Sequence, residues 1–195
     1  MMGDLGRQHA IVHDAARDVL DFWFALSMEQ QFARNAALDA QIAGRFGPLR
    51  DQVLRTRAME WRDGPDQLLA AIILLDQFSR NIYRDSPRAY EADALAVELC
   101  QLAIERGWEG RYAPEERAFL YMPLMHAEDL PLQRLSVAKF SELGGGNLAY
   151  AVGHLEVIAR FGRFPTRNAV LGRETTPGER AYLDDPDDDF GPPKG

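Results

Sequence analysis

The 195-residue sequence has a single cysteine, Cys100, and no long apolar run. One cysteine excludes an internal disulfide and any metal site built from several thiolates, and it is typical of a reducing cytoplasm. The longest strongly apolar run, Leu68 to Leu75, is far shorter than the ~20 residues needed to cross a bilayer. The first ten residues lack the apolar core of a secretory signal. We therefore expect a cytoplasmic protein that does not partner a membrane.

The chain also has fewer basic than acidic residues, so its net charge is −8. Nucleic-acid binding requires clustered Lys and Arg, so this balance argues against a nucleic-acid partner. The hydrophobic fraction of 46% is ordinary for a folded chain, and the length fits one domain. We expect a single helical domain over residues 1–183. The remaining residues, 184–195, are rich in Asp, Pro and Gly and are expected to form an acidic, disordered tail.

No stretch shows the alternation of a β-strand, and helical periodicity dominates. A central helix is predicted over residues 65–82, and its apolar run indicates that it is covered on all sides. The Gly47-Pro48 pair predicts a break between helical segments 38–46 and 49–56.

Further along, the Ser86-Pro87 pair predicts the start of a helix over residues 87–106. Pro123 predicts a kink in the helix that opens at Pro114. The fold class is thus all-α, with eight to ten helices stacked as antiparallel hairpins. No clean internal repeat is found at a fixed spacing.

Three stretches together resemble a known bacterial family. They are LDQFSRNIYR at 75–84, YMPLMHAED at 121–129 and RFGRFPTRNAVLGR at 160–173. In this order they are similar to the family called domain of unknown function 924, and the likeness extends from the first helix to Leu183. The resemblance implies an all-helical fold similar to tetratricopeptide-repeat proteins. It implies no activity.

The chain departs from the family pattern at three positions. Ser79 stands where the family usually has proline, Ala127 where it has serine, and Thr166 where it has histidine. The last departure matters most, because a mechanism that uses a histidine in that turn cannot operate in this chain.

The first candidate site lies at the polar end of the central helix, which carries Asp76, Gln77, Arg80 and Asn81. Asp76 and Arg80 are four residues apart with the acid first, the favourable order for an ion pair on a helix. They continue an apolar stripe, so at least one should point inward and be paired. The pair therefore has two interpretations, a structural tie between helices or part of a ligand site.

The second candidate is an anion site around Arg167 and Asn168, at the start of a short helical turn. Arg163 and Arg173 flank it and are candidate ligand-binding residues, as is Arg80 if the fold brings the regions together. The alternative is that these arginines hold neighbouring carboxylates and helix-end carbonyls.

Candidates for acid–base chemistry are His126, His154 and Glu128. His154 lies on an otherwise apolar stripe, where a histidine is more often a core residue than a base. The histidines lack metal-ligand spacing, and phosphate loops and nucleotide-binding glycine motifs are absent, so neither a metal nor a cofactor is predicted.

Three functions remain open. The first is a binding module for an anionic small molecule or peptide. The second is a cofactor-independent enzyme that uses His126 or His154 as acid or base. The third is a purely structural or assembly role. The sequence does not determine the oligomeric state.

Overall fold

The predicted central helix is buried in the core of the protein. The computed structural model describes residues 2–185, with side chains from residue 10 onward. Residues 68–75 are each at most 1% exposed. In chain order the elements are α1 (Met2–Phe24), α2 (Met28–Phe32), α3 (Ala36–Arg55), η1 (Met59–Trp61), α4 (Pro65–Ile73), η2 (Leu74–Phe78), α5 (Ser79–Ile82), η3 (Pro87–Ala89), α6 (Asp93–Glu105), η4 (Trp108–Arg111), α7 (Pro114–His126), α8 (Leu130–Leu143), α9 (Asn147–Phe161), η5 (Pro165–Arg167) and α10 (Pro177–Asp184). Residues 2–185 contain no strand, so the all-α prediction is confirmed.

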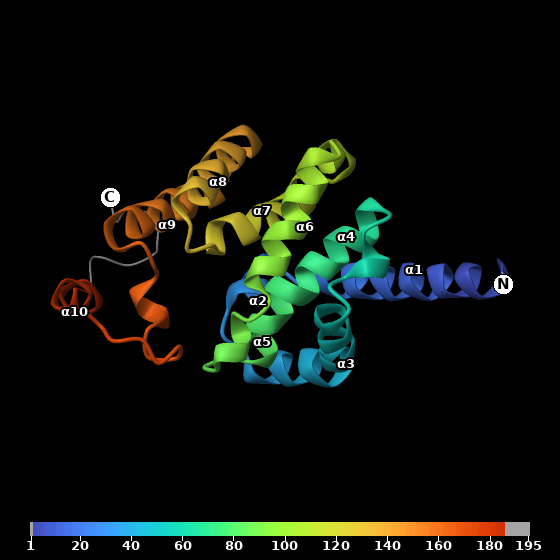
Figure 1. Ribbon diagram of the computed structural model, residues 1–195, viewed down its shortest axis with the longest axis horizontal. Helices are drawn as coiled ribbons and strands as arrows, with labels where there is room; N and C mark the ends of the chain where they lie inside the picture. The colour runs from blue at the N-terminus through green and yellow to red at the C-terminus, as the bar shows by residue number, and fades with distance from the viewer. Residues whose placement is uncertain (1, 186–195) are drawn as a thin grey trace.

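Helices α1, α6 and α7 lie around α4, and α8, α9 and α10 extend away from it (Figure 1). Helix α4 packs against α1, α6 and α7, and the turns that follow it pack against α3. Helices α6, α7 and α8 each pack against the next helix in the chain, as successive hairpins do. Helices α8, α9 and α10 lie at the opposite end of the molecule from the start of α1 (Figure 1).

The predicted break at Gly47-Pro48 is wrong, because α3 runs through Pro48 as one helix. Proline removes one helical hydrogen bond. However, Leu38, Ile42 and Phe46 before it and Val53 after it form one buried stripe. This stripe packs on η2 and α5. Burial of a continuous apolar face outweighs the loss of a single backbone bond.

The polar end of the central helix differs from a regular α-helix. Residues 74–78 form a π-helix, η2, between α4 and α5. Such segments insert one extra residue into a helix and are frequent at functional sites. Asp76 lies in the middle of η2, where its side chain is 1% exposed. The helix predicted over 87–106 is also interrupted, because 87–89 form a 3₁₀ turn and α6 begins only at Asp93.

A fully buried arginine ties α3 to the end of the central helix. Arg50 is 0% exposed, and its Nε donates to Ser79 Oγ at 2.8 Å. Its Nη1 donates to Glu91 at 2.7 Å and to Asp51 at 3.0 Å. The guanidinium also lies 4.8 Å from the Tyr83 ring centroid. The buried cation is therefore both paired and hydrogen-bonded, as burial requires.

A small second core fixes the C-terminal segment. Val157, Ile158, Phe164 and Tyr182 pack together beneath α9 and α10. The core holds Phe164 immediately before η5, which carries Arg167. Of the predicted acidic tail, residues 186–195 lie outside the described residues. Within the described part of the chain, none of the helices has the length and apolarity needed to cross a bilayer.

Candidate functional site

Asp76 is the buried centre of a polar cluster. Its Oδ1 lies 2.8 Å from Nη1 of Arg80, and its Oδ2 accepts from Nε2 of Gln77 at 2.6 Å. Nδ1 of His126 lies 2.9 Å from both carboxylate oxygens. Burial alone would raise the pKa of Asp76, but Arg80 and His126 hold it well below its usual range. Asp76 is therefore an ionised carboxylate at neutral pH.

His126 ends α7, three residues after Pro123, and the Asp76 carboxylate orients its ring. Since Asp76 is ionised, Nδ1 carries the proton and donates to it, which leaves Nε2 as the basic nitrogen. Among the described residues Nε2 has no hydrogen-bond partner. Burial lowers the pKa of His126 despite the opposing effect of Asp76, so the imidazole is neutral at pH 7. The side chain keeps 18% of its surface exposed, so the ring is not sealed in the core.

Asp93, the first residue of α6, joins the central helix to the C-terminal segment. Nη2 of Arg80 lies 3.1 Å from Asp93 Oδ1. Nη1 of Arg167 donates to Asp93 Oδ2 at 3.2 Å, and its Nη2 donates to the backbone oxygen of His126 at 2.9 Å. The end of the central helix, the end of α7 and the Arg167 segment therefore meet, and Asp93, which joins them, was not among the residues predicted from the sequence.

Two aromatic rings hold the guanidinium of Arg167. Its Cζ lies 4.6 Å from the Tyr90 ring centroid and 4.6 Å from that of Phe164. Arg80 approaches the same Tyr90 ring at 5.8 Å. Stacking of this kind fixes the plane of the guanidinium and leaves its edges for hydrogen bonding. Burial and the neighbouring positive charge of Arg80 lower the pKa of Arg167.

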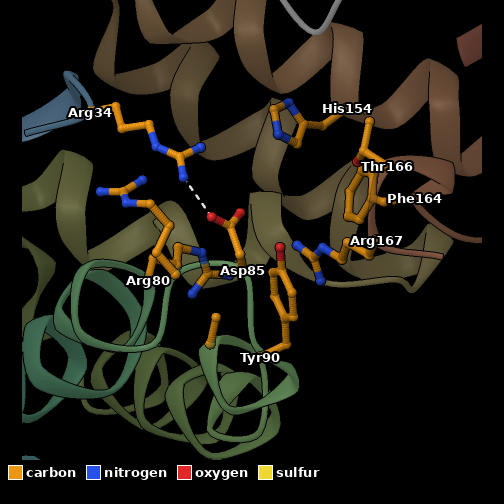
Figure 2. Close-up of a pocket in the computed structure, with 10 residues that line it drawn as sticks. Arg34, Arg80, Asp85, Tyr90, His154, Phe164, Thr166 and Arg167 are labelled. Carbon is orange, nitrogen blue, oxygen red and sulfur yellow. Dashed lines mark hydrogen bonds and ion pairs between the residues drawn. The ribbon is translucent and has the colours of Figure 1, made fainter. Parts of the chain in front are cut away.

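These side chains border a polar pocket of about 360 Å³, which we call the cationic pocket. Its lining residues are Arg34, Arg80, Arg84, Asp85, Ala89, Tyr90, His154, Phe164, Thr166 and Arg167. Figure 2 shows His154, Phe164 and Arg167 facing Arg34 and Arg80 across it. The cations come from segments far apart in the chain, so only the tertiary fold assembles this pocket.

His154 on α9 is the imidazole that borders the cationic pocket. Its Nδ1 donates to the backbone oxygen of Tyr150 at 2.8 Å. Its ring centroid lies 6.3 Å from that of His126 and 5.4 Å from that of Phe164. Burial and the nearby His126 lower the pKa of His154 to about 4, so it too is neutral at pH 7.

A second pocket, of about 520 Å³, shares Tyr90 and Arg167 with the cationic pocket. We call it the apolar pocket. Its apolar lining residues are Pro87, Ala94, Val97, Ala127, Leu132 and Leu171. His126 and Asp93 also face it, together with the carboxylates Glu91, Glu128 and Asp129. His126, whose ring Asp76 orients, therefore lines a cavity that has room for a ligand.

Two predicted residues of the central helix do not line either pocket. Gln77 is buried, and its Nε2 contacts Asp76 Oδ2 and, at 3.3 Å, the sulfur of Met122. Asn81 donates to Asp39 at 2.8 Å, beside the bidentate contact that Arg84 makes with the same carboxylate. Gln77 thus supports Asp76, whereas Asn81 helps to tie the central helix to α3.

The predicted residues near the C-terminal end form a separate structural cluster. Glu128 accepts two hydrogen bonds from Arg173, at 2.6 and 2.9 Å, and one from the backbone nitrogen of Phe164. Asn168 is fully buried and accepts from Arg173 Nε. Arg163 pairs with Glu179 of α10 at 2.6 Å. These contacts hold the segment that carries Phe164 and Arg167 in place.

For the residues that the structure describes, no group of three or more His, Cys, Asp or Glu side chains is arranged to hold a metal ion. The single cysteine does not supply a reactive thiol either. Cys100 is fully buried, and burial raises its pKa. A protonated, inaccessible thiol is a poor nucleophile.

Comparison with known proteins shows which family shares this sequence and which solved structure shares this fold. Residues 19–187 match the family described as "Bacterial protein of unknown function (DUF924)". The chain belongs to the DUF924 family. It is also similar to a solved structure titled "Structure of Protein of Unknown Function ATU0120 from Agrobacterium tumefaciens". The identity is 38%, the match covers 88% of this chain and 98% of the other, and the TM-score is 0.85. No curated protein matches the chain.

The three positions at which the resemblance implied a departure from the family pattern fall at or beside the polar cluster. Thr166 lines the cationic pocket, and Ala127 lines the apolar pocket. Ser79 follows η2 and accepts from Arg50. The likeness to tetratricopeptide-repeat proteins, which this family membership implied, stays a prediction.

Sequence reasoning missed several residues of the cationic pocket and its support, chiefly Arg34, Tyr90, Asp93 and Phe164. Asp93 had one weak signal, its place in the first turn of a helix, but an acid there is explained by the helix dipole alone. Tyr90 and Phe164 had no signal beyond being aromatic. Their role depends on partners that are distant in the sequence.

Proposed function

We propose that the cationic pocket binds a small anionic molecule or the anionic end of a peptide. The observation that carries this proposal is the guanidinium of Arg167, clamped between Tyr90 and Phe164 and facing Arg80 in one pocket. A planar guanidinium with a fixed orientation suits bidentate recognition of a carboxylate or phosphate. Aligning it before binding reduces the entropy that the ligand must overcome.

Donors remain for a ligand after the internal contacts of both arginines. A guanidinium has several N–H donors, spread over Nε and both Nη atoms. Arg80 uses its Nη atoms on Asp76 and Asp93, and Arg167 uses its Nη atoms on Asp93 and the His126 oxygen. Among the described residues, neither Nε has a partner. Asp93 thus orders the two cations and leaves other edges for an anion.

A thermal-shift screen of anionic metabolites, followed by titration calorimetry of each hit, tests the proposal. Arg167→Gln should weaken binding by roughly tenfold or more, because it removes a charge-assisted contact. Arg134→Gln is the matched control, since Arg134 is exposed on α8 and does not line the cationic pocket. Its affinity should equal that of the wild type.

A second variant tests the pocket without disturbing the buried network. Thr166 is exposed and lines the cationic pocket, so Thr166→Asp adds a negative charge there and leaves the contacts of Arg167 in place. It should weaken anion binding while the circular dichroism spectrum and Tm stay unchanged. If Arg167→Gln unfolds the protein and Thr166→Asp binds anions normally, the cluster has a structural role instead.

The His126–Asp76 pair supports a second candidate, a cofactor-independent enzyme with His126 as general base. A carboxylate orients the imidazole, and Nε2 is the basic nitrogen beside the apolar pocket. Such a base can take a proton from water as the water attacks a carbonyl carbon. Hydrolysis of p-nitrophenyl esters tests it. Turnover should be lost in His126→Gln and retained in His154→Gln, and equal rates in both variants would exclude this role.

A further inference from the structure

The charges around the cationic pocket indicate which kind of anion it takes. The lining cations are Arg34, Arg80, Arg84 and Arg167. Their carboxylate partners are Asp39, Asp76, Asp85 and Asp93. The two sets cancel, and both histidines are neutral at pH 7. A group with two negative charges would therefore leave a net charge of −2 in a partly buried site, which is costly. A single negative charge is the better match.

The neighbouring apolar pocket determines what can be attached to that charge. It meets the cationic pocket at Tyr90 and Arg167. Its wall includes Val97, Leu132 and Leu171, which offer an apolar surface to a ligand that extends past the Tyr90 ring.

The carboxylates at the apolar pocket determine which chemical groups can lie at the far end of the ligand. Glu91 pairs with Arg50, Glu128 pairs with Arg173, and the Asp129 side chain caps α8. They are thus engaged in the fold, and they would repel a second negative group placed beside them.

We propose that the ligand is a monocarboxylate with an uncharged, apolar body. Its carboxylate lies against Arg167 and Arg80, and its body lies against the wall formed by Val97, Leu132 and Leu171. This proposal rests on the proposed function and names the ligand class of the same site. His126 then faces the bound ligand near the junction between its charged and apolar parts.

Titration calorimetry with simple carboxylates at pH 7.5 tests the ligand class. Acetate, butanoate and hexanoate vary the length of the body. Adipate adds a second carboxylate at the length of hexanoate, 6-aminohexanoate adds an ammonium, and inorganic phosphate supplies a dianion. Affinity should rise about fourfold for each buried methylene. Hexanoate should bind more tightly than adipate, 6-aminohexanoate and phosphate.

Matched variants locate the two parts of the ligand. Leu171→Asn should reduce the gain per methylene and leave acetate binding unchanged, whereas Arg167→Gln should weaken every carboxylate. Phe32→Ser is the control for unspecific apolar binding, because Phe32 is 54% exposed and lines a different apolar groove beside α7. It should bind the whole series like the wild type.

The outcomes separate this inference from the proposed function. If no anion binds, or Arg167→Gln has no effect, the proposed function fails. If acetate and hexanoate bind equally well, or if adipate, 6-aminohexanoate or phosphate binds most tightly, the pocket holds an anion of another class and the monocarboxylate inference is overturned. A length dependence that disappears in Phe32→Ser but persists in Leu171→Asn would overturn it as well.

Discussion

Replacement of Asp93 by asparagine should strengthen anion binding, the reverse of the usual effect of removing a buried charge. Asp93 lies behind the two guanidiniums that face the cationic pocket, within 3.2 Å of both Arg80 and Arg167. It compensates part of their charge in the free protein. The substituted amide would keep nearly the same shape and leave the pocket with one excess positive charge.

The size of the effect follows from Coulomb's law. A ligand carboxylate on the far edges of the two guanidiniums would lie about 6 Å from Asp93, which corresponds to a repulsion of about 3 kcal/mol at an effective dielectric constant of about 20. The three side chains are partly exposed, at 17% for Asp93, 22% for Arg80 and 12% for Arg167, so solvent screens part of this energy. We expect about 1.4 kcal/mol to remain, a tenfold gain in affinity.

Glu91→Gln is the control for this measurement. Glu91 lines the same apolar pocket, but its carboxylate pairs with Arg50 and Arg88 instead of the pocket arginines. Both substitutions change the net charge by one unit, so a general electrostatic effect would be equal in both. Calorimetry with hexanoate or any screening hit gives the two affinities, and circular dichroism verifies the fold. An unchanged or weaker affinity in folded Asp93→Asn would refute the reasoning.

Two further outcomes concern stability. Asp76→Asn removes the buried carboxylate that pairs with Arg80 and accepts the hydrogen bond from His126, so we expect a loss of about 3–5 kcal/mol and a Tm about 6–20 °C lower by calorimetry. Asp18→Asn, which removes only an exposed pair with Arg45, should cost less than about 1 kcal/mol. The second outcome is a pH effect. His154 has a pKa of about 4 in the folded state, below its value in the unfolded state, so the unfolded state binds more protons between these two values. The free energy of unfolding therefore falls as the pH drops from about 6.5 to 4. Urea unfolding from pH 7.5 to 4.5 should show a shallower decline in His154→Gln, and identical slopes would contradict that pKa.

The helical elements were largely predictable because their signals are local. The apolar run from Leu68 to Leu75 indicated a helix covered on all sides, and its burial confirms this. Local signals failed where packing opposed them. Pro48 marks a break by its own chemistry, but the buried stripe of α3 continues through it. The π-helix at Asp76 was not predicted, and no local sequence signal marked it.

Within the polar cluster, a pairing was predictable only where the two residues are close in the sequence. Asp76 and Arg80 are four residues apart, so their ion pair was visible in the sequence and is present in the structure. His126 lies 50 residues from Asp76, and Arg167 lies 74 residues from Asp93. No spacing rule relates side chains at such separations. The sequence analysis included Arg80 in the Arg167 site only if the fold brought the two regions together, and it could not identify Asp93 as the residue that joins them.

The sequence by itself determined an all-α chain, a buried central helix and a set of polar residues at its end, because helical periodicity and ion-pair spacing act over a few residues. Tertiary structure decided which of those residues share a pocket. It placed Arg167 between Tyr90 and Phe164, turned Glu128 and Arg173 toward one another, and set the neutral His126 against Asp76. Only packing between distant helices brings these groups within hydrogen-bonding distance, and burial together with the neighbouring charges sets their protonation states.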